Sequence, residues 1–278
     1  MERLEVPVGP LTFDARATGP ADGDVVLLLH GFPQTSHAWR HQLDALGADG
    51  CRAVAPDQRG YSPGARPVEV AAYHPERLVE DVVGIADALG APRFHIVGHD
   101  FGGLVAWHTA ARHPERLVTL TSVSTPHPHA MARSILEGGE QAEKSSYMLF
   151  FQSPEAEAFF LDNDAAGLRG LYESTGLSDT DEYVRVLGER AAMTAALNWY
   201  RALDRDVIAR MGPIITPTLY VWSTEDQALG REAAEATAAQ VDGPYRFEVL
   251  ERVGHFIPEE VPDRLSALLL EHLRTTAG

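Results

Sequence analysis

The sequence predicts an α/β fold built on a mostly parallel sheet with helices on both faces. Short apolar runs alternate along the chain with amphipathic helical patterns, which is typical of a parallel sheet. Several runs, such as DVVLLLHG at 24–31, are continuously apolar, as in strands that are buried on both faces. The alternation stops between about 127 and 212, where the composition is helical and no buried strand is evident. We interpret this segment as a helical insertion over the sheet.

The expected elements follow one another in a regular order. Residues 11–19 alternate in polarity and predict an edge strand, and Ser36 or Thr35 is suited to cap the first helix. The other strands are expected at 24–31, 51–57, 93–100, 117–124, 217–223 and 245–251, and the helices at 36–47, 75–90, 102–114, near 229–240 and from about 259. The predicted domains are a core of residues 1–126 and 213–278 and a helical cap of residues 127–212.

Composition narrows the possible partners and the location. The net charge of −17 disfavours nucleic acid and anionic membranes. The start lacks the pattern of a signal peptide, and no apolar run reaches the roughly 18–20 residues that span a bilayer. No cluster has metal-ligand spacing. We therefore expect a cytoplasmic monomer or homodimer that acts on a small molecule, without metal or cofactor.

Two stretches compete for the position of a catalytic elbow. GHDFGG at 98–103 joins an expected strand to an expected helix, and its glycines permit a strained turn that exposes Asp100. GYSPG at 60–64 fits the serine-hydrolase pattern, but Pro63 has no N–H to donate to an oxyanion, and no clean helix follows. Asp100 is thus the candidate nucleophile, and Ser62 is not. The alternative for Asp100 is a simple helix cap without chemistry.

Three further features favour catalysis. The Gly-rich turn HGFP at 30–33 can aim the N–H of Phe32 at the same point as the N–H of Phe101, which makes an oxyanion hole. His255 follows the last expected strand. Asp226 follows the preceding one and can orient the His255 ring, although Glu225 is a rival. The order nucleophile, acid and histidine is that of α/β-hydrolases.

A carboxylate nucleophile restricts the chemistry. Its pKa near 4 leaves it ionised at neutral pH, and it is suited to displacement at a saturated carbon. Epoxides and alkyl halides fit such an attack, which forms an alkyl ester that a His255-activated water then hydrolyses. Epoxide opening also needs a hydrogen-bond donor for the alkoxide, and Tyr147 and Tyr200 in the insertion are candidates. For an isolated tyrosine, packing is the competing explanation.

The chain resembles the epoxide hydrolase group of the α/β-hydrolases over essentially its whole length. The matching stretches are HGFP, DQRGYSPG, GHDFGG, the Tyr147 segment, LNWYR at 197–201, the Asp226 loop and GHFIPEE at 254–260. The resemblance implies a mostly parallel eight-stranded sheet with a helical cap. It also implies that Asp100 is the nucleophile, that His255 and Asp226 activate water, and that Tyr147 and Tyr200 polarise the epoxide. The match at Tyr147 is looser, and Tyr172 or Tyr183 competes with it.

Departures from the family pattern bear on the alternatives. The family's usual Trp after the nucleophile is Phe101 here, which keeps the backbone donor. Haloalkane dehalogenases also resemble the chain, but they use the indole N–H of that Trp to hold the halide. A binding protein on the same fold is a third possibility, which the retained triad disfavours. Aromatic residues predict a pocket for an apolar or aryl epoxide, namely Phe32, Phe101, Phe151 and Trp199, with Phe150, Phe159 and Phe160 also in the cap.

Overall fold

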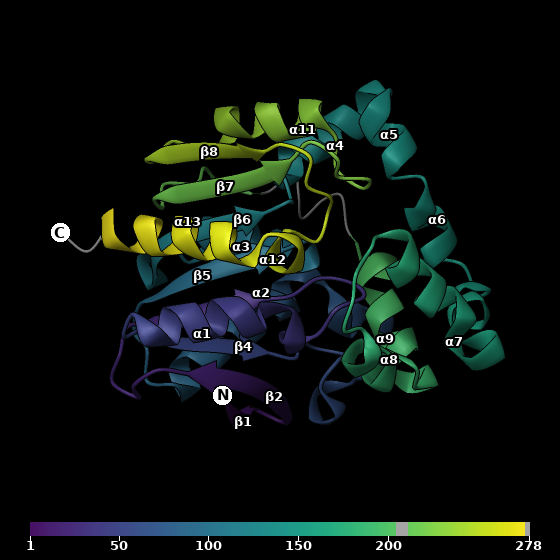
Figure 1. Cartoon of the computed structure of the whole chain (residues 1–278), viewed down its shortest axis with the longest axis horizontal. Helices are drawn as coiled ribbons and strands as arrows, with labels where there is room; N and C mark the ends of the chain where they lie inside the picture. The colour runs from purple at the N-terminus through teal and green to yellow at the C-terminus, as the bar shows by residue number, and fades with distance from the viewer. Residues whose placement is uncertain (204–210, 276–278) are drawn as a thin grey trace.

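An eight-stranded sheet forms the centre of the molecule (Figure 1). The computed structural model describes residues 1–203 and 211–275. The strands lie in the order β1-β2-β4-β3-β5-β6-β7-β8; only the β1–β2 and β2–β4 pairs are antiparallel. Their bounds are Glu2–Val8, Leu11–Thr18, Val25–Leu29, Arg52–Pro56, Phe94–His99, Leu117–Val123, Thr218–Ser223 and Tyr245–Leu250 for β1 to β8. The predicted mostly parallel sheet is thereby confirmed.

The edge of the sheet differs from the prediction. Residues 11–19 were expected at the edge, but they form β2, and β1 (Glu2–Val8) lies outside it. In β1, Leu4, Val6 and Val8 are at least partly buried, whereas most of the residues between them are exposed. The alternation is present in the sequence, but it covers only three apolar residues and contains Pro7, which disfavours a strand other than at an edge. The expectation of an edge strand at 11–19 was therefore wrong.

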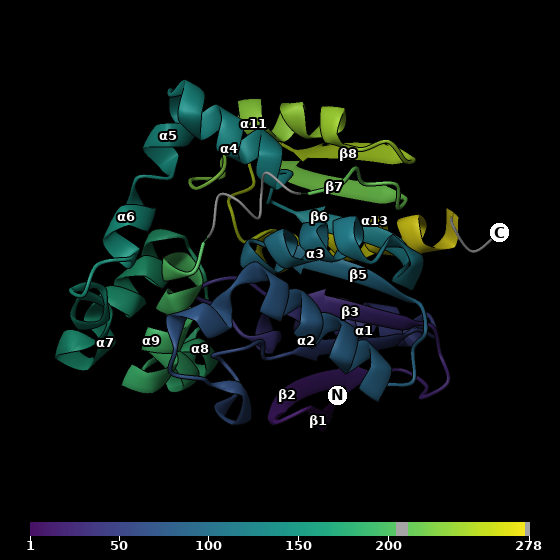
Figure 2. The ribbon, with the colours of Figure 1, turned by 180° about the vertical axis from the view of Figure 1, so that it is seen from behind.

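Helices cover both faces of the sheet (Figures 1 and 2). Helices α1 (Arg40–Ala48) and α13 (Pro262–Thr275) pack on one face, and α2 (Pro75–Ala88), α3 (Phe101–Arg112) and α11 (Arg231–Ala236) on the other. Strand β3 alternates between them: Val26 and Leu28 join the core under α1 and α13, and Leu27 and Leu29 the core under α2 and α3. This alternation explains its continuously apolar sequence.

Short helical turns modify some expected boundaries. The helix expected at 36–47 begins as a 3-10 turn, and the Thr35 side chain, not Ser36, caps it by accepting from the N–H of His37 at 3.3 Å. The helix expected near 229–240 is α11 followed by a 3-10 turn. The 3-10 turns are η1 (Ser36–Trp39), η2 (Pro63–Ala65), η3 (Val70–Tyr73), η4 (Pro114–Arg116) and η5 (Thr237–Gln240), and the short α12 spans Ile257–Glu260.

The expected insertion lies between β6 and β7. Its helices are α4 (Pro128–Glu137), α5 (Glu140–Lys144), α6 (Tyr147–Phe151), α7 (Ala156–Ser174), α8 (Asp181–Leu187) and α9 (Arg190–Arg201). Helices α6 to α9 stand beyond one end of the sheet, whereas α4 packs against α11 beside it (Figures 1 and 2). Residues 127–203 include no strand. Residues 204–210, close to the expected cap boundary at 212, lie outside the described residues.

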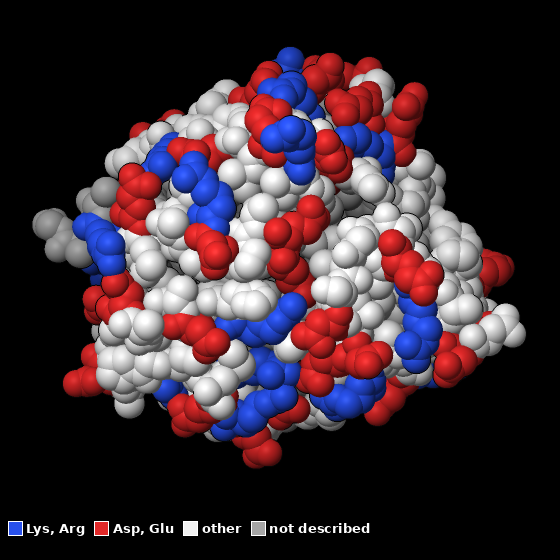
Figure 3. Space-filling model, in the orientation of Figure 1, with Lys and Arg blue, Asp and Glu red and all other residues white. Residues whose placement is uncertain are grey.

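The surface carries mixed charges. On the face in Figure 3, acidic and basic side chains are interspersed, and small groups of each kind lie side by side. Within residues 1–203 and 211–275, no helix combines the length and the apolar character that a membrane crossing requires.

Candidate active site

Asp100 occupies a sharp turn between β5 and α3. Its backbone has φ 53° and ψ −121°, a region in which non-glycine residues are strained and which is typical of functional sites. A Cβ at Gly98 would lie 2.1 Å from the carbonyl oxygen of Gly102, and a Cβ at Gly102 would lie 2.0 Å from that of Leu29. The flanking glycines therefore allow the first turn of α3 to pack closely against the ends of β3 and β5.

Backbone donors surround the Asp100 carboxylate. The N–H of Phe32 donates to Asp100 Oδ1 at 2.8 Å, and the N–H of Phe101 also bonds to the carboxylate. A Cβ at Gly31 would lie 2.3 Å from the Cβ of Asp100, so a glycine is needed for this approach. Burial raises the pKa of Asp100, but the hydrogen bond and the charge of His255 outweigh it and leave the pKa lowered. The carboxylate is thus ionised at neutral pH.

His255 stands between two carboxylates. Its Nε2 lies 3.6 Å from Asp100 Oδ2, and its Nδ1 lies 2.9 Å from Asp226 Oδ2. Burial lowers the pKa of His255, but the charge of Asp226, together with Asp100, raises it to about 10. His255 is therefore an imidazolium at neutral pH as long as both carboxylates are ionised.

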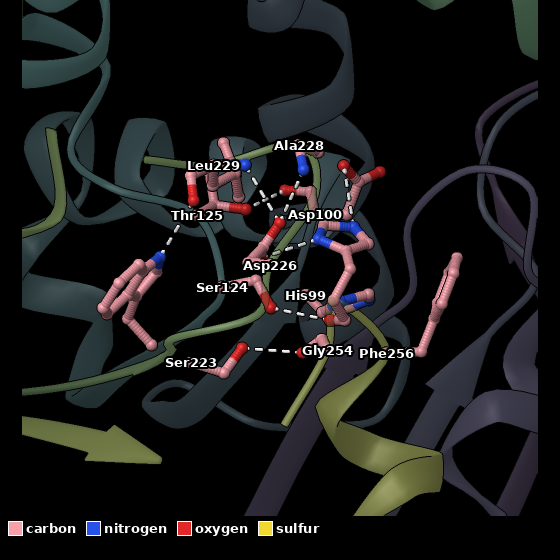
Figure 4. A network of polar contacts seen from close by, with 12 residues as sticks. His99, Asp100, Ser124, Thr125, Ser223, Asp226, Ala228, Leu229, Gly254 and Phe256 are labelled. Carbon is pink, nitrogen blue, oxygen red and sulfur yellow. Dashed lines mark hydrogen bonds and ion pairs between the residues drawn. The ribbon is translucent and has the colours of Figure 1, made fainter. Parts of the chain in front are cut away.

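Asp226, rather than Glu225, contacts the histidine. Its side chain is fully buried, and its Oδ1 accepts from the N–H groups of Ala228 at 2.8 Å and Leu229 at 2.9 Å (Figure 4). Glu225 is exposed. These bonds fix the carboxylate so that its other oxygen faces His255 Nδ1.

Helix α5 clamps the Asp226 loop from the insertion side, a contact that was not predicted from the sequence. Lys144 Nζ donates to the backbone oxygen of Asp226. Gln141 donates to the Ala228 oxygen at 3.0 Å and accepts from the N–H of Gly230 at 2.7 Å. The position of the acid therefore depends on α5 as well as on the end of β7.

Tyr147 and Tyr200 lie over the elbow. Their ring centroids are 6.3 Å apart, and the Tyr200 ring packs against Phe101 at 4.6 Å and Phe32 at 5.5 Å. Burial raises the pKa of both tyrosines, and the negative charge of Asp100 raises each further. Both phenols therefore keep their protons and stay hydrogen-bond donors.

The two competing tyrosines lie elsewhere. The Tyr172 hydroxyl donates to the Pro33 carbonyl oxygen, and the Tyr183 hydroxyl donates to Glu259 Oε1 at 2.9 Å. Both side chains are fully buried. Their hydroxyls are engaged in contacts between the insertion and the core, away from Asp100.

The predicted aromatic pocket residues gather around Phe32. Phe151 and Phe160 each lie 5.5 Å from the Phe32 ring. Trp199 packs against Phe101 at 5.4 Å, and its indole N–H donates to the Arg59 carbonyl oxygen at 2.9 Å. Phe150 and Phe159 contact one another on the outer side and are 39% and 55% exposed. The side chains packed around Phe32 and Phe101 are therefore aromatic, but the Trp199 N–H is already bonded to the Arg59 oxygen.

Ser62 belongs to a structural loop. Its hydroxyl donates to the Asp57 carbonyl oxygen and accepts from the N–H of Asp14 at 2.9 Å. The side chain is fully buried, and the residue directly precedes the turn η2 without a side-chain capping bond to it. Its hydrogen bonds tie this loop to β2.

Two residues that were not predicted hold the backbone of His255. The His255 carbonyl oxygen lies 2.9 Å from His99 Nε2 and accepts from Ser124 Oγ at 2.9 Å (Figure 4). Thr125 Oγ1 donates to the Asp100 carbonyl oxygen at 2.7 Å. The only sequence signal was position: His99 directly precedes the elbow, and Ser124 and Thr125 directly follow β6.

Comparison with known proteins agrees with this architecture. Residues 24–262 match the family model of the alpha/beta hydrolase fold. An AB hydrolase superfamily protein of Bacillus subtilis is 35% identical over 95% of each chain, and epoxide hydrolase A of Mycobacterium tuberculosis is 33% identical over 92% of each.

Solved structures give the same result. An epoxide hydrolase from metagenomes of hot environments superposes with a TM-score of 0.88 at 31% identity, covering 98% of both chains. The Bacillus megaterium epoxide hydrolase with an inhibitor gives a TM-score of 0.90 at 26% identity, covering 98% of this chain and all of that one. The chain therefore belongs to the α/β-hydrolase family and, within it, to the epoxide hydrolase group.

Proposed function

We propose that this protein hydrolyses an apolar or aryl epoxide to a vicinal diol through an ester on Asp100. One observation carries the proposal: the ionised Asp100 carboxylate sits at a strained elbow, held by the Phe32 N–H at 2.8 Å, with His255 on one side. Tyr147 and Tyr200 lie near enough for the Asp100 charge to raise the pKa of each, and both remain protonated. Relatives that are named epoxide hydrolases support the reaction class, hydrolysis of an ether bond.

In the first step, an Asp100 oxygen attacks an epoxide carbon, and the carbon–oxygen bond of the ring breaks. The developing alkoxide receives hydrogen bonds, and then a proton, from Tyr147 or Tyr200. A phenol suits this role because its proton is retained at neutral pH beside a carboxylate. The product is a hydroxyalkyl ester of Asp100.

In the second step, water attacks the ester carbonyl carbon of Asp100. Esterification removes the negative charge that helps to raise the His255 pKa, so His255 can pass its proton to the tyrosinate left by the first step and act as a base. It takes a proton from the attacking water, and Asp226 stabilises the imidazolium that forms. The N–H groups of Phe32 and Phe101 stabilise the oxyanion. Collapse of this intermediate breaks the bond to the alkyl oxygen, which takes the proton from His255 and leaves as the diol. The carboxylic acid that remains on Asp100 then gives its proton to His255, which restores the carboxylate and the imidazolium.

The chemistry divides between the two proposed domains. Residues 1–126 and 213–278 form the core that carries Asp100, Asp226 and His255. Residues 127–212 form the cap that carries the two phenols. The aromatic wall of Phe32, Phe101, Phe151 and Trp199 favours an apolar or aryl substituent on the epoxide.

The dehalogenase reading gains no support from the site. Release of a halide needs N–H donors near the leaving group, and Phe101 has no side-chain donor. The indole of Trp199 is nearby, but its N–H is bound to the Arg59 oxygen. Haloalkanes are therefore the comparison substrates in the test.

The test is intact-protein mass spectrometry on His255→Gln, which forms the ester but hydrolyses it slowly. An aryl or alkyl epoxide should add its whole mass, on the peptide that contains Asp100. The matched control Asp100→Ala/His255→Gln should show no adduct. An adduct from haloalkanes alone would replace the proposed epoxide hydrolase with a dehalogenase. A small molecule bound without any covalent adduct would point to a binding protein.

A further inference from the structure

A buried chain of polar side chains runs from the catalytic histidine to the insertion. His99 Nε2 lies 2.9 Å from the carbonyl oxygen of His255, and His99 Nδ1 lies 3.1 Å from Gln34 Oε1. Gln34 Nε2 donates to Glu259 Oε2, and the other oxygen of Glu259 accepts from the Tyr183 hydroxyl of α8 at 2.9 Å. His99 and Gln34 are fully buried, and the Glu259 side chain is 3% exposed.

The donors and acceptors along this chain can be counted. A backbone carbonyl only accepts, so the His99 nitrogen that faces His255 must carry a hydrogen. An ionised Glu259 also only accepts, so the Gln34 amide nitrogen must face it and the Gln34 amide oxygen must face His99 Nδ1. This second ring nitrogen must then carry a hydrogen as well.

Arg40 decides the charge of Glu259. Its Nη1 lies 2.8 Å from Glu259 Oε1, and the Arg40 side chain is itself mostly buried. A buried guanidinium at this distance strongly favours the ionised carboxylate. The arrangement in which Glu259 is neutral and the Gln34 amide is reversed would leave Arg40 facing an uncharged group.

We infer that His99 is a doubly protonated cation, and that Glu259 is a positioning residue that holds it so through Gln34 while anchoring helix α8. A neutral ring would direct a lone pair at a carbonyl or amide oxygen about 3 Å away, with no hydrogen between the two atoms. In the inferred state every polar atom of this chain has a partner.

The surroundings both oppose and support this charge. Burial and the positive charge of His255 lower the pKa of His99 and oppose the charge. Asp100 and Asp226 raise this pKa, and Glu259 adds a third carboxylate at the far side of the Gln34 amide. Three carboxylates therefore favour a positive charge on His99, and the charge of His255 opposes it. The charge of Arg40 is paired with Glu259. A His99 cation at pH 7.5 therefore requires the nearby carboxylates, together with the two oxygen atoms about 3 Å from the ring nitrogens, to outweigh burial.

A positive charge on His99 would affect the ester hydrolysis of the proposed function, and this coupling rests on that proposed function. The rings of His99 and His255 lie 4.8 Å apart between centroids. A cation at His99 opposes a second positive charge on His255, so it favours the neutral, basic form of His255 once Asp100 is esterified. Loss of the His99 charge should therefore raise the His255 pKa in the ester and move hydrolysis to higher pH.

The decisive experiment is NMR of the protein labelled with ¹⁵N in its histidine rings. The ring signals of His99 are assigned by correlation with the backbone signals of the same residue. At pH 7.5 we expect both His99 nitrogens to carry a hydrogen. In Glu259→Gln, one of the two ring hydrogens should be lost. The matched control is Glu260→Gln on the same helix, because Glu260 accepts from the N–H groups of Gly254 and Phe256 and, among the described residues, has no bond to Gln34 or His99. In this control both hydrogens should remain.

The outcomes separate this inference from the proposed function, because the NMR measurement needs no substrate. If one His99 nitrogen of the wild-type protein carries no hydrogen, the inference is overturned. This result needs only the wild-type protein, so it holds even if Glu259→Gln fails to fold. Single-turnover hydrolysis provides the second measurement: in Glu259→Gln the acidic limb of its pH profile should move up by about one unit. An unchanged limb would remove the coupling to His255.

Discussion

The charge on Asp100 should control the basicity of His255, and Asp100→Asn tests this directly. The asparagine keeps an oxygen for the Phe32 N–H and removes the charge, as esterification does. His255 Nε2 lies 3.6 Å from Asp100 Oδ2. Coulomb's law gives about 1.2 kcal/mol for this pair in water and about 4.6 kcal/mol at an effective dielectric constant of about 20. Division by about 1.4 kcal/mol per unit gives a fall of about one to three pKa units.

The sign follows from the charges. The wild-type pKa of His255 is raised to about 10, and removal of one anion lowers it toward its ordinary value. Ring ¹⁵N NMR titration of His255 in both proteins measures the shift, and intact mass confirms that the side chain is still an amide. Glu225→Gln, in the exposed residue beside Asp226, should leave the titration unchanged. An equal or higher His255 pKa in Asp100→Asn would refute the proposed switch from imidazolium to base.

Three further predictions address the phenols, the buried histidines and the rejected serine. Tyr200→Phe should slow the opening of the epoxide by about tenfold or more, measured as the single-turnover rate of ester formation, whereas unchanged opening would assign Tyr200 to packing. His108 is buried without a hydrogen-bond partner among the described residues, and burial lowers its pKa to about 4. Its contribution to stability is therefore present above the unfolded pKa of about 6.5 and is lost as the pH falls toward 4, by up to about 1.4 kcal/mol per pH unit. Urea unfolding between pH 7 and 5 should accordingly depend less on pH in His108→Leu than in the wild type, and equal slopes would contradict this. Ser62→Ala should cost about 1–3 kcal/mol of unfolding free energy through its two buried bonds but leave kcat unchanged, and a loss of turnover in folded protein would reopen the serine alternative.

The sheet and the elbow could be predicted because their signals are local. The apolar run before Asp100 and the glycines around it define the strand, the turn and the helix within a few residues. His255 and Asp226 could be singled out because parallel strands bring their carboxyl ends to one edge. The outer strand β1 was missed because its alternation covers only three apolar residues and Pro7 within it disfavours a strand.

The insertion could be predicted only as helical. Which of Tyr147, Tyr172 and Tyr183 approaches Tyr200 depends on packing between helices that are distant in sequence. Helix α7 also contains non-helical residues from Asp162 to Ala165, three of them with positive φ, although no glycine marks this kink. The roles of His99 and Glu259 depend likewise on long-range hydrogen bonds that no local pattern reveals.

The contact of Lys144 with the Asp226 carbonyl has a practical consequence for anyone who attaches this protein to a surface. Lys144 is the only lysine in the sequence, and its side chain is 21% exposed. Amine-reactive resins and dyes therefore have one side-chain target. Acylation there would replace the ammonium group that donates to the Asp226 loop with a larger, uncharged amide. Coupling through carboxylates, or through a cysteine introduced on a distant helix, would leave this loop intact.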